Sequence, residues 1–200
     1  MNQNRNEIIK ALQSMCRIFW GPDIKLCSKI MTGEFFHPFD SLLQKSHEEQ
    51  QIMDNIKLVT HGFNSADTLF ERLDQCYIDL FINSRDGIKA PLYESCYMYE
   101  NAPMMGKPAL DMMDRFKSKE LSMEHRLHEP PDHIAIELEY LFFLLQEEDV
   151  LSGEAASFAN KTMLPWVKLI IQRLESVSGT CKFYYFSGNL LIFILGKIKD

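Results

Sequence analysis

Apolar residues recur along most of this chain at the spacing of an amphipathic α-helix. The clearest stretch is Ala66–Phe81, where an apolar residue stands at every third or fourth position. Asn64 and Ser65 come directly before it, where a helix N-cap is expected. The same periodicity predicts further helices over Glu7–Trp20, Gly106–Lys117 and Leu164–Val177. The chain is therefore predicted to be predominantly helical.

The most apolar of the predicted helices follows Pro130 and Pro131. Two prolines bar a helix from extending backwards past them. Asp132 is a favoured N-cap, because its carboxylate can accept a backbone N–H two or three residues further on. A buried helix is therefore expected to begin near His133 and to continue to Leu145.

Signals for β-strands are almost absent. Lys182–Phe186 is the one stretch that could be extended, and a terminal helix over Leu190–Ile198 is the preferred interpretation of this end of the chain. No internal repeat divides the sequence. These observations predict an all-α fold, a single globular bundle of about seven to nine helices that forms one domain over residues 1–200.

Charge and cysteine content limit the partners and the cellular compartment that are expected for this chain. A formal net charge of −7 argues against a nucleic-acid partner. The amino-terminal residues lack the apolar core of a signal peptide, and Leu190–Leu195 is far too short to span a bilayer, so no membrane insertion is expected. The five cysteines form no C-x-x-C pair and no pairing pattern. Free thiols in a reducing cytoplasm are therefore predicted.

Two motifs carry a family resemblance. The first is Glu129-Pro-Pro-Asp-His133, which is followed in the next helix by Glu137, Leu138 and Tyr140. The second is Ala90-Pro-Leu-Tyr-Glu-Ser-Cys-Tyr97, in the long connection before Gly106. Together they resemble the signatures of the TorD/DmsD family, the cytoplasmic maturation chaperones of exported molybdoenzymes. A weaker likeness is a tryptophan on a late helix, here Trp166.

The resemblance implies a function in binding and no enzymatic activity. It implies a chaperone that binds the twin-arginine leader or the apo form of a molybdoenzyme subunit and assists cofactor insertion before export. The expected partners are the molybdoenzyme catalytic subunit and its signal peptide. No cofactor is predicted for the chaperone itself, because the chain has no glycine-rich phosphate loop. Whether two copies form a homodimer stays open.

The peptide groove is predicted to be apolar inside and acidic at its rim. Its candidate residues come from both motifs and from the helix over Ala66–Phe81. They are Asp132, His133, Glu129, Glu137, Tyr93, Glu94, Ser95, Tyr97, Leu73 and Tyr77.

Three alternatives remain open from the sequence. Asp132 can be an N-cap only, with His133 hydrogen-bonded locally in the first turn. The cluster His125–Glu137 can serve a metal-dependent hydrolase, although it contains no H-E-x-x-H motif and no cysteine pair. The chain can also be a helical scaffold or assembly subunit that binds no leader.

Overall fold

The computed structural model describes residues 3–40, 42–43, 47–85, 87–98, 105–123, 129–147, 153–177, 179 and 181–199. All regular elements within these ranges are helical, and the one β-type contact is an isolated bridge between Tyr93 and His133. The all-α prediction is confirmed. None of the described helices is long and apolar enough to cross a membrane.

Helices follow one another along the whole of the described chain, and η marks short 3-10 or π-helical turns between them. They are α1 (Gln3–Phe19), α2 (Ile24–Thr32), η1 (Glu34–Phe36), α3 (His37–Asp40), α4 (His47–Thr60), α5 (Ala66–Tyr77), η2 (Ile78–Ile82), α6 (Ser95–Met98), α7 (Lys107–Ser118), α8 (Ile134–Glu147), α9 (Glu154–Ser157), η3 (Phe158–Met163), α10 (Leu164–Val177) and α11 (Lys182–Lys197).

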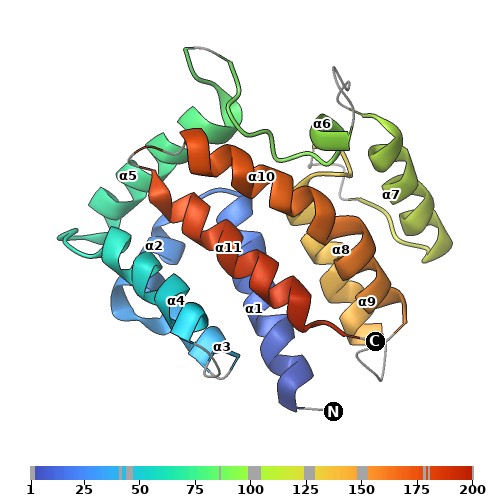
Figure 1. The fold of residues 1–200 in the computed structure, drawn as a ribbon, viewed down its shortest axis with the longest axis horizontal. Coiled ribbons are helices and arrows are strands. Elements are labelled where there is room, and N and C mark those ends of the chain that lie inside the picture. Colours follow the sequence, from blue (N-terminus) through green and yellow to red (C-terminus); the bar gives the residue numbers. More distant parts are fainter. Residues whose placement is uncertain are drawn as a thin grey trace.

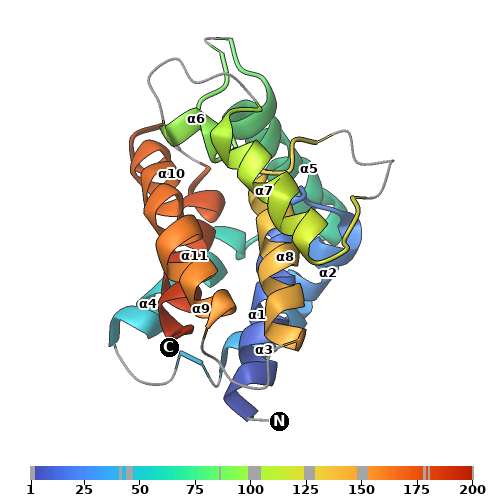
Figure 2. The same cartoon turned by 90° about the vertical axis from the view of Figure 1, so that its right-hand side faces the viewer.

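The helices form two packed layers (Figure 1). One layer contains α1 and α8 side by side, with α2 and α5 at one end; the other contains α4, α10 and α11. In Figure 2 the layers are seen edge-on, and α7 lies in front of α8. Buried apolar side chains between them form one hydrophobic cluster that extends from Ile8 to Ile198.

The local sequence signals act where they were predicted. Ser65 caps α5, and it forms a reciprocal capping box with Thr68. The helix α10 has the predicted bounds, and Pro108 stands in the first turn of α7. Gly21 ends α1 with a φ of 109°, a conformation that favours glycine. The helices α2, α3 and α4 were not predicted.

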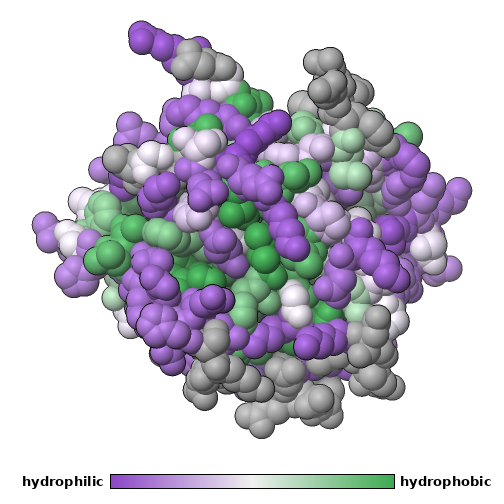
Figure 3. Space-filling view, viewed as in Figure 1, coloured by the Kyte–Doolittle hydropathy of each residue, from purple (hydrophilic) through white to green (hydrophobic). Residues whose placement is uncertain are grey.

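The helix α11 begins at Lys182, so the extended interpretation of Lys182–Phe186 is wrong. One side of α11 is buried in the core. Apolar residues on its other side are partly buried, and they include Tyr185, Ile192 and Phe193. Figure 3 shows apolar side chains gathered on the face that contains this helix. Because α11 is apolar nearly all round, its sequence lacks the periodicity that would reveal its start.

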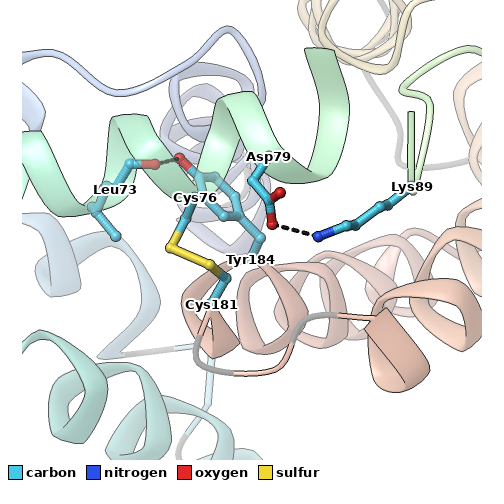
Figure 4. The surroundings of a disulfide bond; sticks show 6 residues. All are labelled: Leu73, Cys76, Asp79, Lys89, Cys181 and Tyr184. Carbon is cyan, nitrogen blue, oxygen red and sulfur yellow. Dashed lines mark hydrogen bonds and ion pairs between the residues drawn. A yellow bond between two sulfur atoms is a disulfide. The ribbon is translucent and has the colours of Figure 1, made fainter. Parts of the chain in front are cut away.

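A disulfide joins Cys76, near the end of α5, to Cys181, directly before α11 (Figure 4). Their Cα atoms lie 5.5 Å apart, although the residues are separated by 105 positions in the sequence. The prediction of free thiols is wrong for this pair, whereas Cys16, Cys27 and Cys96 are free. Nothing in the spacing of the cysteines reveals the pair, because only the packing of the two layers brings them together.

Gly188 allows α10 and α11 to pack closely. A Cβ atom at this position would overlap the side chain of Ile171. We expect Gly188→Val to lower the free energy of unfolding by about 1–3 kcal/mol, because overpacking forces neighbouring side chains out of place. Denaturant unfolding measures this effect.

The matched control is Gly196→Val on the same helix, where a Cβ atom would meet nothing within 4 Å. Ile171→Ala should recover part of the loss in the Gly188→Val variant, because it removes the overlapping atoms. Equal effects of the two glycine substitutions would contradict this account.

Candidate functional site

The connection before α6 is hydrogen-bonded to the start of α8. The backbone N–H of Glu94 donates to the carbonyl of Asp132 at 3.0 Å, and the N–H of Ile134 donates to the carbonyl of Leu92 at 2.9 Å. Between these bonds lies the isolated bridge of Tyr93 with His133. The two sequence motifs, distant along the chain, therefore form one structural unit.

Asp132 joins the two motifs and does not cap α8. Its side chain is fully buried, and its Oδ2 accepts the backbone N–H of Ser95 at 2.8 Å. The N-cap prediction for Asp132 is wrong, because Nδ1 of His133 accepts the N–H of Ala135 at 3.2 Å instead. The hydroxyl oxygen of Ser95 accepts the N–H of Gly106 at 3.1 Å. The Oδ1 atom of Asp132 is buried without a hydrogen-bond partner.

Glu94, Asp132 and Glu137 form a buried acidic cluster, and the structure places all three in the interior instead of at a solvent-facing rim. Burial, together with the charge of Asp132, raises the pKa of Glu94 to about 7. Burial and the neighbouring Glu94 raise the pKa of Glu137 well above its usual value. Trp166 Nε1 donates to Oε2 of Glu137 at 3.0 Å, whereas Oε1 of Glu137 is buried without a hydrogen-bond partner. The pair therefore keeps a proton near neutral pH.

The imidazole of His133 lies between two aromatic rings. Its centroid is 5.1 Å from that of Trp20, nearly parallel, and 5.2 Å from that of Tyr93, edge-on. Burial lowers the pKa of His133 to about 4, so the ring is neutral at physiological pH. The hydroxyl of Tyr93 donates to Oε2 of Glu129 at 2.6 Å. His133 is thus a packing residue with its local hydrogen bond satisfied.

The remaining candidate residues are Tyr97, Tyr77 and Leu73, and they do not all join the buried acidic cluster. Tyr97 contacts the ring of Trp166, with centroids 5.9 Å apart, and donates its hydroxyl hydrogen to the carbonyl of Pro91. Tyr77 donates its hydroxyl hydrogen to the carbonyl of Phe19 at 3.0 Å, and burial, together with the charge of Glu129, raises its pKa. Leu73 is buried in the core, where its carbonyl accepts the hydroxyl of Tyr184, so it does not join the site.

Two hollows open on either side of Glu139, a residue that the sequence did not single out. The α7–α8 hollow has a volume of about 600 Å³. It is lined by Trp20, Phe116, Leu121, Ser122, Met123, Ile136, Glu139, Tyr140 and Phe143. The α1–α8 hollow has a volume of about 850 Å³, and residues from α1, α2, η1, α3 and α8 line it. Trp20 contacts His133, and Tyr140 of the same motif lines the α7–α8 hollow, so this hollow borders the first sequence motif.

A metal centre finds no support among the described residues, where no group of three or more His, Cys, Asp or Glu side chains is arranged to hold a metal ion. His125 and His128 of the predicted cluster lie outside the described residues.

Comparisons with known proteins agree with this architecture. Residues 42–172, more than half of the chain, match the family described as "Nitrate reductase delta subunit". The chain is 25% identical over 207 residues to the chaperone protein TorD of Aliivibrio salmonicida, with 95% of each protein covered. It is 30% identical to the TorD of Vibrio atlanticus, with 90% of each covered. A crystal structure of an Archaeoglobus fulgidus protein assigned to redox enzyme maturation has the same fold, with a TM-score of 0.60 at 18% identity over 98% of this chain and 95% of that one.

These relatives define the class as all-helical chaperones, which are not enzymes. The chain belongs to the nitrate reductase delta subunit and TorD family of redox enzyme maturation chaperones. The resemblance read from the two motifs and the expectation of a non-enzymatic protein are both confirmed.

Proposed function

We propose that this chain acts in the cytoplasm as a single-domain chaperone that binds the twin-arginine leader of a molybdoenzyme catalytic subunit before export. The observation that carries the proposal is the α7–α8 hollow, which borders the first family motif through Tyr140 and through Trp20, stacked on His133. Holding the leader there would delay export until the cofactor has entered the apo subunit.

The lining of the α7–α8 hollow suits the apolar part of such a leader. Apart from Ser122 and Glu139, the described residues that line it are apolar or aromatic. Amphipathic helices commonly bind proteins by laying an apolar face into such a groove. A volume near 600 Å³ accommodates several side chains of a peptide and leaves the rest of the helix at the surface.

The motif residues then support the groove from behind. The bond of Asp132 to Ser95 and the stacking of His133 on Trp20 fix the wall of the hollow. In this proposal, Asp132, Ser95, Glu94 and Glu137 hold the wall in place without touching the peptide. Tyr93 and Glu129 are partly exposed, so in this proposal they can contact the peptide, unlike the buried acids.

Phe116 offers a direct test, because its ring forms one wall of the hollow and packs edge-on against Tyr140. We expect Phe116→Ala to weaken the binding of a twin-arginine leader peptide about tenfold, since it removes apolar surface that the peptide would bury. Calorimetric titration of the purified chain with a synthetic leader measures the effect.

Leu110→Ala is the matched control, because Leu110 is on the same helix but is 54% exposed and does not line the hollow. Equal affinity of the wild type and both variants would place the peptide elsewhere. If the wild type binds no leader, the chain is better explained as an assembly subunit that contacts another surface of its client.

A further inference from the structure

We propose that Glu139 binds the guanidinium group of a leader arginine, while the apolar stretch of the leader occupies the α7–α8 hollow. This inference rests on the proposed function and assigns a specific contact within it. Glu139 belongs to neither family motif, and its role is inferred from its position between the two hollows, both of which it lines.

The exposure of Glu139 is exceptional for its part of the chain. All other residues from Pro131 to Leu141 are buried, and Glu139 alone is exposed. Glu137, two positions earlier, points into the core toward Trp166. The carboxyl group of Glu137 is therefore inaccessible to ligands, whereas that of Glu139 is accessible to them.

Neighbouring side chains orient the carboxylate of Glu139 and leave one oxygen available. Its Oε1 accepts the indole N–H of Trp20 at 2.8 Å and the thiol of Cys16 at 3.7 Å. Its Oε2 accepts no hydrogen bond from the residues that the structure describes. A carboxylate can accept several hydrogen bonds, and a guanidinium donates in pairs with matching geometry. Glu139 therefore has capacity for an arginine without losing its bond to Trp20.

Among the described residues, no cation forms an ion pair with Glu139. Arg17 lines the α1–α8 hollow, but it forms an ion pair with Asp23 at 3.0 Å. Lys29 lines the same hollow and pairs with Glu34 at 2.6 Å. A cationic ligand is consequently the group that would complete the coordination of Glu139.

The charges around the two hollows also set the direction of the peptide. The α1–α8 hollow carries Lys10, Arg17 and Lys29, and its acid Glu34 is already paired with Lys29, so among its described lining residues Glu139 is the carboxylate open to an arginine. Glu139 is the only charged side chain among the described residues that line the α7–α8 hollow. The structure thus favours arginine at Glu139 and the apolar stretch along α7, and not the reverse direction.

The test is a double-mutant cycle with Glu139→Gln and a leader peptide in which each arginine in turn is changed to Gln. We expect Glu139→Gln to weaken binding of the twin-arginine peptide about tenfold or more, as for a charge-assisted contact. Against the peptide that lacks the contacting arginine, wild type and Glu139→Gln should bind equally. The glutamine keeps an oxygen for the indole N–H of Trp20, and an unchanged melting temperature confirms the fold.

Glu147→Gln, at the exposed end of the same helix, controls for the loss of one negative charge. Equal weakening by Glu139→Gln and Glu147→Gln would overturn the inference in favour of a general charge effect. So would a Glu139→Gln effect that persists with every arginine-substituted peptide, although leader binding itself would stand. No binding of the wild type to any leader would overturn the proposed function, and the inference with it.

Discussion

Removal of the Cys76–Cys181 disulfide is expected to lower the free energy of unfolding by about 4 kcal/mol. The bond closes a loop with a sequence separation of 105, and cross-linking a loop of this length strongly restricts the unfolded chain. The paired Cys76→Ala and Cys181→Ala variant should therefore unfold at a lower denaturant concentration than the oxidised wild type. Denaturant unfolding with and without a thiol reductant gives the comparison.

Cys27→Ala is the matched control, because Cys27 is also fully buried but forms no disulfide. The Cys27→Ala variant keeps the Cys76–Cys181 cross-link, so its loss of stability in reductant should equal that of the wild type. The paired variant should not respond to reductant at all. A wild type whose unfolding curve is the same in oxidant and reductant would show that the bond contributes no stability.

The protonated pair Glu94–Glu137 is expected to make the protein less stable as pH rises above neutrality. The folded-state pKa of Glu137 is raised well above its usual value, so the folded protein holds a proton that the unfolded chain has already released. Stability from this group is complete below the unfolded pKa and is lost as pH rises through the folded pKa. The free energy of unfolding should fall by about 1.4 kcal/mol per pH unit above pH 7, for as long as Glu137 keeps its proton.

His133 contributes little to the pH dependence of stability above pH 7. Burial lowers its folded-state pKa to about 4, so its contribution is present above the unfolded pKa and is lost only as pH falls toward 4. Unfolding measured at several pH values between about 7 and 7.5 therefore reports mainly on the carboxyl pair, because the free thiols of the unfolded chain ionise chiefly above this range.

Glu137→Gln should remove most of this slope. The amide cannot ionise, and it can still accept the indole N–H of Trp166. The variant should be more stable than the wild type at the upper end of the range. Glu139→Gln, on the exposed side of the same helix, should keep the wild-type slope. A Glu137→Gln variant with an undiminished slope would show that another group releases the proton.

The sequence predicted the helices whose signals are local. Ser65 before α5 and Pro165 in the first turn of α10 mark boundaries that depend only on neighbouring residues. The helix α4 escaped prediction because its apolar stripe is sparse, and one of its buried positions is Glu49, which pairs with Lys197 of α11 at 3.2 Å. Such a position becomes recognisable only when the distant partner is known.

In the candidate site, too, the features that depend on neighbouring residues were predicted and those that depend on distant partners were not. Both motifs were found from sequence, but their acids were predicted at a solvent-facing rim, because acidic side chains are rarely buried without partners. The partners of Asp132 and Glu137 come from other parts of the chain, namely the N–H of Ser95 and the indole of Trp166. Glu139 lies two positions after Glu137 in the strongly apolar helix α8, so the two acids face different sides of that helix. This spacing was the signal in the sequence that could have identified Glu139 as an exposed acid.

The disulfide also restricts how two copies of this chain can combine. It closes residues 76 to 181 into a covalent ring that contains α6 through α10. An exchange of helices between copies that opens a hinge inside this ring would place the two cysteines of one site on different chains. While the bond is oxidised, such a dimer has to be covalently linked, whereas α1 to α4, which lie outside the ring, can exchange in either state. The oxidation state of one bond therefore determines which part of the fold two molecules can share.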